Sequence, residues 1–170
     1  WQSVSTFALI QGSQLSNGWV ILFTSWYITL CITGFFALLG FALPTQKLLS
    51  DSYYKIKHPQ LLKEVYTFFQ VGLFRRILLA TLWRSRKMQK GHFNGSKSGL
   101  NQLDIQSRKS EFGHLLPFIV CIMLSIYLFT LGKVKLSFGV FMINVVGNWY
   151  PIILQRHHRM RLLKISNRKN

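Results

Sequence analysis

The chain has 170 residues, 49% of them apolar, and carries 21 Lys and Arg against only 4 Asp and Glu, a formal charge of +17. This charge is segregated, because the first 46 residues contain no charged side chain, whereas an ordinary soluble domain disperses both signs over its surface. No nucleic-acid-binding motif accompanies the cations, so the expected partners are membrane lipids or an anionic water-soluble substrate, and no nucleic acid.

The first predicted element is a transmembrane helix at about residues 19–43. These residues hold no charge and are enough to cross a hydrocarbon layer of ~30 Å with some tilt. Pro44 ends the predicted helix. The two cysteines, Cys31 and Cys121, both fall inside predicted spans and fit no metal-ligand spacing, which predicts packing roles and no metal site.

A long basic loop follows over residues 47–111 and holds 13 of the 21 cations and all four acids. Apolar residues from Leu61 to Leu73 share one helical face, a pattern typical of an amphipathic helix in the plane of the membrane. Arg75 and Arg76 interrupt the apolar run. We therefore expect a shorter segment that dips toward the bilayer rather than a fourth span.

Residues 84–110 are rich in Gly, Ser and Asn and are predicted to be mostly loop. Within them, the stretch KGHFNGSK, residues 90–97, contains His92 and Asn94. Its composition fits a surface turn and equally the rim of a site at the membrane surface.

The second predicted span, residues 112–131, is entered through the stretch EFGHLLPF. Glu111 and His114 are three residues apart, so on a helix they share a face, where a carboxylate can fix the tautomer of an imidazole and raise its basicity. This spacing predicts a general base at the membrane surface. The alternative is that Glu111 is an interfacial anchor and His114 a polar residue at the start of a helix.

The third predicted span, residues 136–154, carries polar residues in an otherwise apolar helix. Steps of four, three and four residues place them in one stripe: Asn144, Asn148, Pro151 and Gln155. Because proline lacks an amide hydrogen, the Gly147 carbonyl loses its helical partner and can accept a hydrogen bond from elsewhere. Polar amides in lipid face protein or a wet cavity, so the stripe either holds helices together or forms the wall of a site.

The tail, residues 155–170, begins with QRHHRMRLLK. Arginines here either clamp phosphates or merely satisfy the positive-inside rule, and Arg156 is the favoured clamp because it continues the polar face past Gln155. The same rule places the basic loop and the tail in the cytoplasm and the turn with Lys133 and Lys135 outside. The loop and the polar ends of two spans then meet at one membrane level.

The predicted fold is an all-α integral membrane protein. It has about three transmembrane helices plus an in-plane amphipathic helix in a large basic cytoplasmic loop, and it forms a single membrane domain over residues 1–170. It is expected in the cell (inner) membrane as a multi-pass protein. The sequence contains no His-x4-Asp acyltransferase box, Gly-x-Ser-x-Gly elbow, Walker loop or histidine-box metal cluster.

Several stretches occur here in an order that resembles one family. They are YTFFQVGLFRRIL, GHFNGSK, KSEFGHLLPF and NVVGNWYPIILQRHHRMRL, and they span roughly residues 66–162. This order resembles the bacterial glycosyl-diaponeurosporenoate acyltransferases of carotenoid (staphyloxanthin-type) biosynthesis. The resemblance implies transfer of a fatty acyl group to a sugar hydroxyl of a glycosylated carotenoid or similar amphiphilic glycolipid. Acyl-CoA or another acyl donor would be a substrate, with no cofactor.

If the chain is such an enzyme, its polar residues have expected roles. His114, oriented by Glu111, would remove the hydroxyl proton during attack on the acyl carbonyl. The oxyanion would be bound by Asn148 or His92. Donor phosphates would be bound by Arg156 and Arg159. The expected substrate-binding residues are Asn94, Asn144, Asn148, Gln155, Arg156 and Arg159.

A second function remains open from the sequence. A small multispan chain with many aromatic residues and few acids also fits a non-catalytic accessory subunit of a larger membrane complex that binds lipid or pigment. The asparagine stripe would then contact a helix of another membrane subunit, and the basic loop would bind lipid headgroups.

Overall fold

The computed structural model describes residues 17–81 and 97–168, and every regular element in this part of the chain is helical. In chain order the elements are α2 (Gly18–Ala42), the 3-10 helix η1 (Thr45–Lys47), α3 (Asp51–Tyr54), α4 (Pro59–Phe68), α5 (Val71–Thr81), α7 (Lys97–Thr130), α8 (Val134–Asn144), the π-helical segment η2 (Val145–Trp149) and α9 (Tyr150–Arg168).

Three helical segments are long and apolar enough to cross a membrane: Gly18–Gly40, Gly99–Thr130 and Val134–Ile165. The third runs through α8, η2 and α9 without a break. The predicted all-α membrane fold with about three spans is therefore confirmed.

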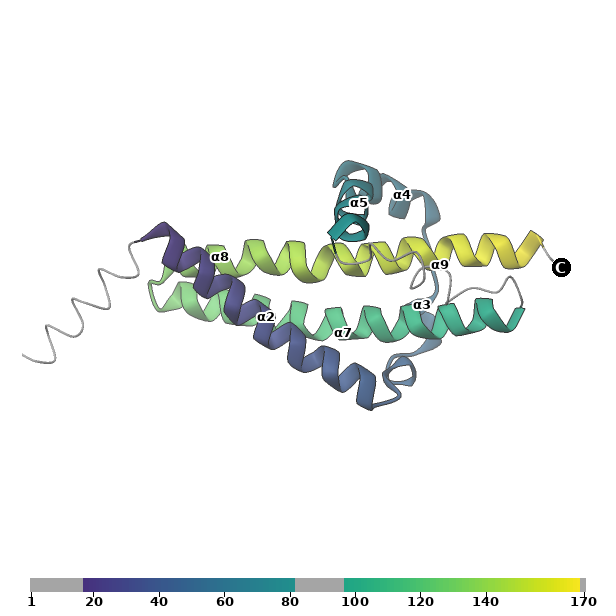
Figure 1. Cartoon of the computed structure of the whole chain (residues 1–170), viewed down its shortest axis with the longest axis horizontal. Coiled ribbons are helices and arrows are strands. Elements are labelled where there is room, and N and C mark those ends of the chain that lie inside the picture. Colours follow the sequence, from purple (N-terminus) through teal and green to yellow (C-terminus); the bar gives the residue numbers. More distant parts are fainter. Residues whose placement is uncertain (1–16, 82–96, 169–170) are drawn as a thin grey trace, which may run out of the picture.

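The three long segments form a bundle along the longest axis of the molecule (Figure 1). α7 and the α8–α9 segment run side by side in opposite directions, and α2 lies across both of them. Gly132 makes the turn between α7 and α8 with a φ of 72°, a left-handed conformation that glycine adopts without steric cost. In this turn Lys133 N–H donates to the Leu128 carbonyl and Gly132 N–H to the Phe129 carbonyl, a Schellman cap of α7.

α7 begins about four turns before the predicted second span, so the prediction that residues 84–110 are mostly loop is wrong for residues 97–110. On this part of α7, Leu100, Ser107 and Glu111 are buried, and they are spaced so that they share one helical face. That face packs against α9. Composition did not reveal the helix because much of its buried face is polar and is satisfied only by the partner helix.

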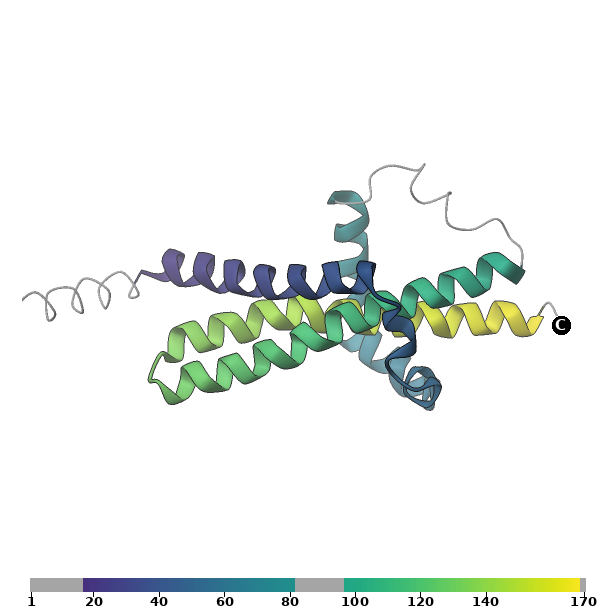
Figure 2. The same ribbon diagram turned by 90° about the horizontal axis from the view of Figure 1, so that it is seen from below.

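The predicted in-plane helix is two helices, α4 and α5, joined at Gln70, whose φ of 49° interrupts the helical path. Both run crosswise to the long axis of the bundle and lie beside α9 (Figures 1 and 2). Part of their apolar face packs on α9, where Val71 is fully buried against Ile153 and Leu154. This packing holds the crosswise pair at a defined position along α9.

α2 approaches α8 closely at Gly139. A Cβ atom at Gly139 would lie 3.2 Å from the Ser25 Cβ and in contact with the Ser25 hydroxyl. The absence of a side chain at Gly139 thus permits the α2–α8 contact, as small residues do between membrane helices.

We predict that Gly139→Ala lowers the free energy of unfolding by about 1–3 kcal/mol, because the added methyl group overpacks the α2–α8 contact. Thermal unfolding in mild detergent, followed by circular dichroism, measures the loss. Gly34→Ala is the matched control, since a Cβ atom at Gly34 meets nothing within 4 Å. Adding Ser25→Gly to Gly139→Ala should restore stability; equal melting of the two alanine variants would contradict the prediction.

Candidate functional site

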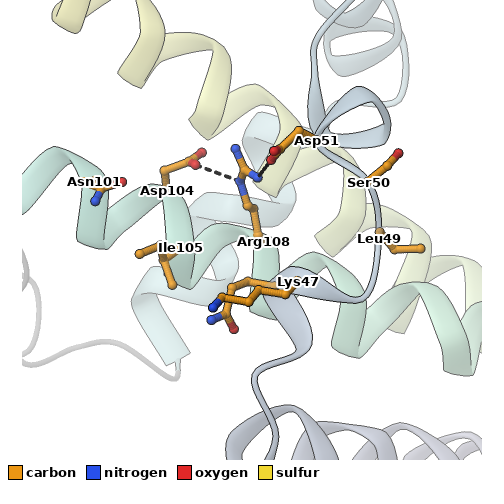
Figure 3. A pocket seen from close by; sticks show the side chains of 9 residues that line it. Lys47, Leu49, Ser50, Asp51, Asn101, Asp104, Ile105 and Arg108 are labelled. Atoms are coloured by element: carbon orange, nitrogen blue, oxygen red, sulfur yellow. Dashed lines mark hydrogen bonds and ion pairs between the residues drawn. The ribbon is translucent and has the colours of Figure 1, made fainter.

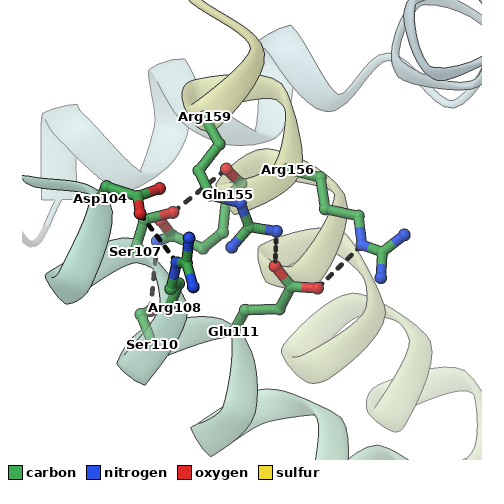
Figure 4. Close-up of polar contacts among 8 residues, drawn as sticks. All are labelled: Asp104, Ser107, Arg108, Ser110, Glu111, Gln155, Arg156 and Arg159. Atoms are coloured by element: carbon green, nitrogen blue, oxygen red, sulfur yellow. Dashed lines mark hydrogen bonds and ion pairs between the residues drawn. The ribbon is translucent and has the colours of Figure 1, made fainter. Parts of the chain in front are cut away.

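A buried ion-pair cluster joins α7 to α9. Glu111, which is fully buried, accepts a hydrogen bond from Arg156 Nε on Oε1 at 2.8 Å and another from Arg159 Nη2 on Oε2 (Figure 4). Arg159 is buried too, whereas the Arg156 side chain is 34% exposed. We call these three residues the Glu111 cluster. It places two positive charges on one carboxylate, so the cluster as a whole is cationic.

The short helix α3 covers this cluster with two tyrosines. The Arg156 guanidinium lies 4.8 Å from the ring centroid of Tyr53, and that of Arg159 lies 5.1 Å from the centroid of Tyr54. Both are cation–π distances. Ser50 caps α3 by accepting a hydrogen bond from the Tyr53 N–H at 3.3 Å. The sequence analysis missed both tyrosines; two adjacent aromatic residues at the start of a basic loop were the available signal.

The environment of the cluster raises the pKa of both phenols. Burial, reinforced by the nearby Glu111 carboxylate, raises the pKa of Tyr54 to about 12, against the opposing effects of Arg159 and Arg108. Burial followed by Glu111 also raises the pKa of Tyr53. Both tyrosines are therefore neutral hydroxyl groups at physiological pH.

Arg159 is not fully satisfied by its partners. Its Nε and Nη1 atoms are buried and have no hydrogen-bond partner among the described residues. A buried guanidinium depends strongly on the one carboxylate that neutralises it, because an uncompensated charge in a low dielectric is costly. The Glu111–Arg159 pair thus constrains how α7 and α9 pack.

One turn further along α7, half-buried His114 belongs to a chain of polar groups that includes the fully buried Asn144 and Asn148. Asn144 Nδ2 donates to the Phe118 carbonyl at 3.0 Å, and Asn148 Nδ2 donates to Asn144 Oδ1 at 2.8 Å. Asn148 Oδ1 then lies 3.1 Å from His114 Nδ1. Thr33 of α2 closes the chain, within 3.1 Å of both Asn148 side-chain heteroatoms.

The direction of this chain determines the tautomer of His114. A carbonyl oxygen only accepts, so the Phe118 carbonyl orients the Asn144 amide, and Asn144 in turn orients Asn148. Asn148 Oδ1 therefore faces His114 as an acceptor, and His114 Nδ1 carries a hydrogen. In the neutral ring the lone pair is then on Nε2.

His114 also has a hydrogen bond to the backbone of Gly147. This is the carbonyl that Pro151 was predicted to release, and it lies in the π-helical segment η2. Asn148 and Gly147 both offer oxygen atoms, so each can accept a hydrogen bond from a ring N–H.

Glu111 and His114 have different partners from those expected. The carboxylate binds two arginines of α9, and the imidazole binds Asn148 and Gly147, so Glu111 does not orient His114 as predicted. The reason is that α9 presents guanidinium groups to the carboxylate, and these bind it more strongly than a neutral imidazole does. The orienting partner of His114 is Asn148.

The remaining predicted residues fall into two groups. Asn144 and Gln155 join helices, since Gln155 Nε2 donates to Ser110 Oγ at 3.2 Å and its carbonyl accepts from Ser107 Oγ at 3.3 Å. His92 and Asn94 lie outside the described residues. Among the residues that the structure does describe, no group of three or more His, Cys, Asp or Glu is placed to hold a metal ion.

A polar pocket of about 430 Å³ lies between the start of α7 and the segment that follows α2 (Figure 3). Arg108 lies on its wall and binds Asp104 at 2.8 Å and Asp51, and its guanidinium also lies 4.9 Å from the Tyr54 ring centroid. The lining residues are Gln46, Lys47, Leu49, Ser50, Asp51, Asn101, Asp104, Ile105 and Arg108. The pocket offers hydrogen-bond donors and acceptors next to the Glu111 cluster.

Comparison with known proteins identifies one family. A family model described as glycosyl-4,4'-diaponeurosporenoate acyltransferase matches residues 50–168, more than two thirds of the chain. The match contains α3, the Glu111 cluster, the residues His114, Asn144 and Asn148, and the α7 wall of the polar pocket, whereas Thr33 precedes it. No curated protein and no solved structure matches the chain.

We predict that Glu111→Gln lowers the free energy of unfolding by about 3–5 kcal/mol, because it leaves the buried Arg159 without a counter-charge. Chemical or thermal unfolding in mild detergent measures the change. Asp51→Asn removes a carboxylate from an ion pair whose Asp51 side chain is 90% exposed, and should cost less than about 1 kcal/mol. Similar losses in the two variants would contradict the structural role of Glu111.

A second prediction concerns alkaline pH. Because the folded protein raises the pKa of Tyr54 from 10.0 to about 12, the fold binds the phenolic proton more tightly than the unfolded chain does. The resulting stability is fully present below pH 10 and is lost as the pH rises toward about 12. Unfolding midpoints measured across this window should fall more steeply for wild type than for Tyr54→Phe. Parallel curves would show that Tyr54 titrates as an exposed phenol.

Proposed function

The chain belongs to the glycosyl-4,4'-diaponeurosporenoate acyltransferase family, and from this membership we propose that it transfers a fatty acyl group to a sugar hydroxyl of a glycosylated carotenoid or similar amphiphilic glycolipid. The observation that supports the chemistry is the His114–Asn148–Asn144 hydrogen-bond chain, which provides an imidazole with a defined tautomer. Acyl transfer to a hydroxyl needs such a base.

In the proposed reaction, His114 Nε2 takes the proton of the sugar hydroxyl while the hydroxyl oxygen attacks the acyl carbonyl carbon. With an acyl-CoA donor, the tetrahedral intermediate collapses by cleavage of the carbon–sulfur bond. The imidazolium then returns the proton to the leaving thiolate, which yields the ester and a free thiol. Asn148, which accepts a hydrogen bond from Nδ1–H, stabilises the imidazolium between these two steps.

The residue that would bind the oxyanion is inferred from which side-chain N–H donors already have an acceptor within the protein. Both amide hydrogens of Asn148 have acceptors, at Asn144 and Thr33, so Asn148 acts as a positioning residue. Arg156 is a better oxyanion donor because it keeps further N–H donors beyond its bonds to Glu111 through Nε and to Tyr53, and because it is partly exposed. The Nη groups of Arg156 extend away from Glu111 (Figure 4). Positive charge aimed at the developing oxyanion lowers the barrier to acyl transfer.

The placement of the acceptor follows from the polarity of the bundle. The apolar chain of the acceptor would lie along the spans, and its sugar would lie near the polar pocket. Arg108 in that pocket and His114 are six residues apart on α7, about 9 Å along the helix axis. Because this distance exceeds the width of one hexose ring, the reacting sugar would lie between the pocket and the imidazole rather than inside the pocket.

The proposed membrane orientation rests on the distribution of cations. Loop 47–111 and tail 155–170 hold 13 and 6 cations, whereas the turn between α7 and α8 holds only Lys133 and the start of α8 Lys135. This turn lies at the same end of the bundle as the start of α2 (Figure 1). The positive-inside rule then favours a cytoplasmic loop and tail in the bacterial inner membrane, with the donor approaching from the cytoplasm.

We predict that protein purified in mild detergent releases thiol from a long-chain acyl-CoA when a glycosylated carotenoid is present. His114→Ala should lower this acceptor-dependent release at least ~100-fold, since a general base contributes about that much or more. His58→Ala is the matched control, because His58 is an exposed residue at the N-cap of α4. It should leave the rate unchanged.

Two results would contradict the proposal. An equal loss of thiol release in His114→Ala and His58→Ala would show that His114 has no specific role in the reaction. Folded wild-type protein that releases no thiol above background would reject this donor and acceptor. Copurification at fixed stoichiometry with large membrane subunits would then favour the accessory-subunit alternative.

A further inference from the structure

Basic side chains from three helices converge on the histidine pair of α9. The His157 ring stacks on Tyr66 of α4, with ring centroids 4.0 Å apart and planes 18° from parallel. The charges that act on His157 are those of Lys63, Arg75, Arg161 and Lys164. Arg75 and Arg161 also act on His158. We call Lys63, Arg75, His157, His158, Arg161 and Lys164 the α9 basic cluster.

The apolar packing beneath this cluster fixes its position. Val71 of α5 is fully buried against Ile153 and Leu154 of α9. Leu62 and Val65 of α4 pack on the same core. The three helices that carry the basic groups are thus held together independently of their charges, which otherwise repel one another.

No Asp or Glu side chain in the described part of the chain forms an ion pair with the cluster. Only four acids exist, and three have other partners: Asp51 and Asp104 bind Arg108, and Glu111 binds two arginines. The fourth, Glu64, lines a pocket at the start of α4. Glu64 follows Lys63 directly on α4, and neighbouring residues on a helix do not face each other. The cluster therefore presents a positive charge that no Asp or Glu side chain pairs, and it is available to an anion outside the chain.

The exposure of the cluster suits a ligand with several negative oxygens. Lys63, Arg161 and Lys164 are exposed, while Arg75 and both histidines are half-buried. The half-buried groups are held in place by packing, and the exposed side chains can close over a bound anion. Guanidinium and ammonium groups in such a setting match phosphate, which accepts several charge-assisted hydrogen bonds.

We propose that the α9 basic cluster binds the phosphate groups of an anionic ligand, either the nucleotide part of a coenzyme A donor or the headgroup of an anionic lipid. The first source rests on the proposed function, and the second does not. The sequence analysis had assigned donor phosphates to Arg156 and Arg159. In the structure both of those arginines bind Glu111, whereas the cluster has no internal anion.

Binding of free coenzyme A to protein in an uncharged detergent, measured by isothermal titration calorimetry, tests the first source. The double variant Arg75→Gln/Arg161→Gln should raise the dissociation constant at least about tenfold, because it removes two charged contacts to phosphate. Arg76→Gln/Lys135→Gln is the control with the same change in net charge. Neither Arg76 nor Lys135 is among the charges that act on the histidine pair, so the control should bind like wild type.

Thermal unfolding in nanodiscs tests the second source without any nucleotide. Phosphatidylglycerol should raise the melting temperature of wild type above its value in phosphatidylcholine, since a ligand that binds the folded state stabilises it. A lipid headgroup site requires that this gain is lost in the cluster variant and kept in the control variant. If the two double variants behave alike both in calorimetry and in nanodiscs, the proposal is wrong.

The outcome can be separated from that of the proposed function and from misfolding. If coenzyme A binding depends on the cluster but no acyl transfer occurs, the α9 basic cluster is a phosphate site and the proposed acyltransferase function is wrong. If the protein transfers acyl groups but the cluster variant binds coenzyme A and lipid as wild type does, the function is supported and the cluster proposal is wrong. Should the first double variant not fold, Lys63→Gln/Lys164→Gln replaces it, because both side chains are exposed and the expected result is the same.

Discussion

The carboxylate of Glu111 is the constraint on which the polar half of this bundle depends. A fully buried carboxylate needs strong donors, and α9 supplies two guanidinium groups to it. The pairing sets the register between α7 and α9 and positions the two arginines, over which the tyrosines of α3 can stack. Because His114 follows one turn later, the same register also brings the imidazole against Asn148.

The second polar motif depends on hydrogen-bond direction rather than on charge. A backbone carbonyl of α7 orients two asparagines in sequence, and the second one orients His114. Inside a low-dielectric bundle such a chain is stable only when every member has its partner. The asparagine stripe therefore packs helices and also positions His114, the base of the proposed reaction, so the two roles that the sequence left open are compatible. Membership of an acyltransferase family gives such a base a chemical purpose.

The distribution of the few acids divides the cations into two classes. Where an acid is present, as at Glu111 and around Arg108, cations are paired and build the fold. Where acids are absent, as around His157 and His158, cations face the surroundings and can bind an external anion. A membrane-facing enzyme that handles an amphiphilic acceptor and an anionic donor would use both classes at one interface.

The spans, the helical class and the amphipathic face of residues 61–73 follow from the sequence by itself. A long uncharged helix satisfies its own backbone in hydrocarbon, and an interface selects one apolar face. The release of the Gly147 carbonyl also follows from Pro151 alone, since proline lacks an amide hydrogen. The hydrogen-bond and ion-pair partners of the buried polar residues did not follow from the sequence. Glu111 and His114 share a helical face, yet each is bound by a different residue of the third span, and residues 97–110 are helical although their composition is polar. Only tertiary structure decided these points, because the pairing of a buried polar group depends on which donors the neighbouring helix brings within reach, and local spacing along one helix does not contain that information.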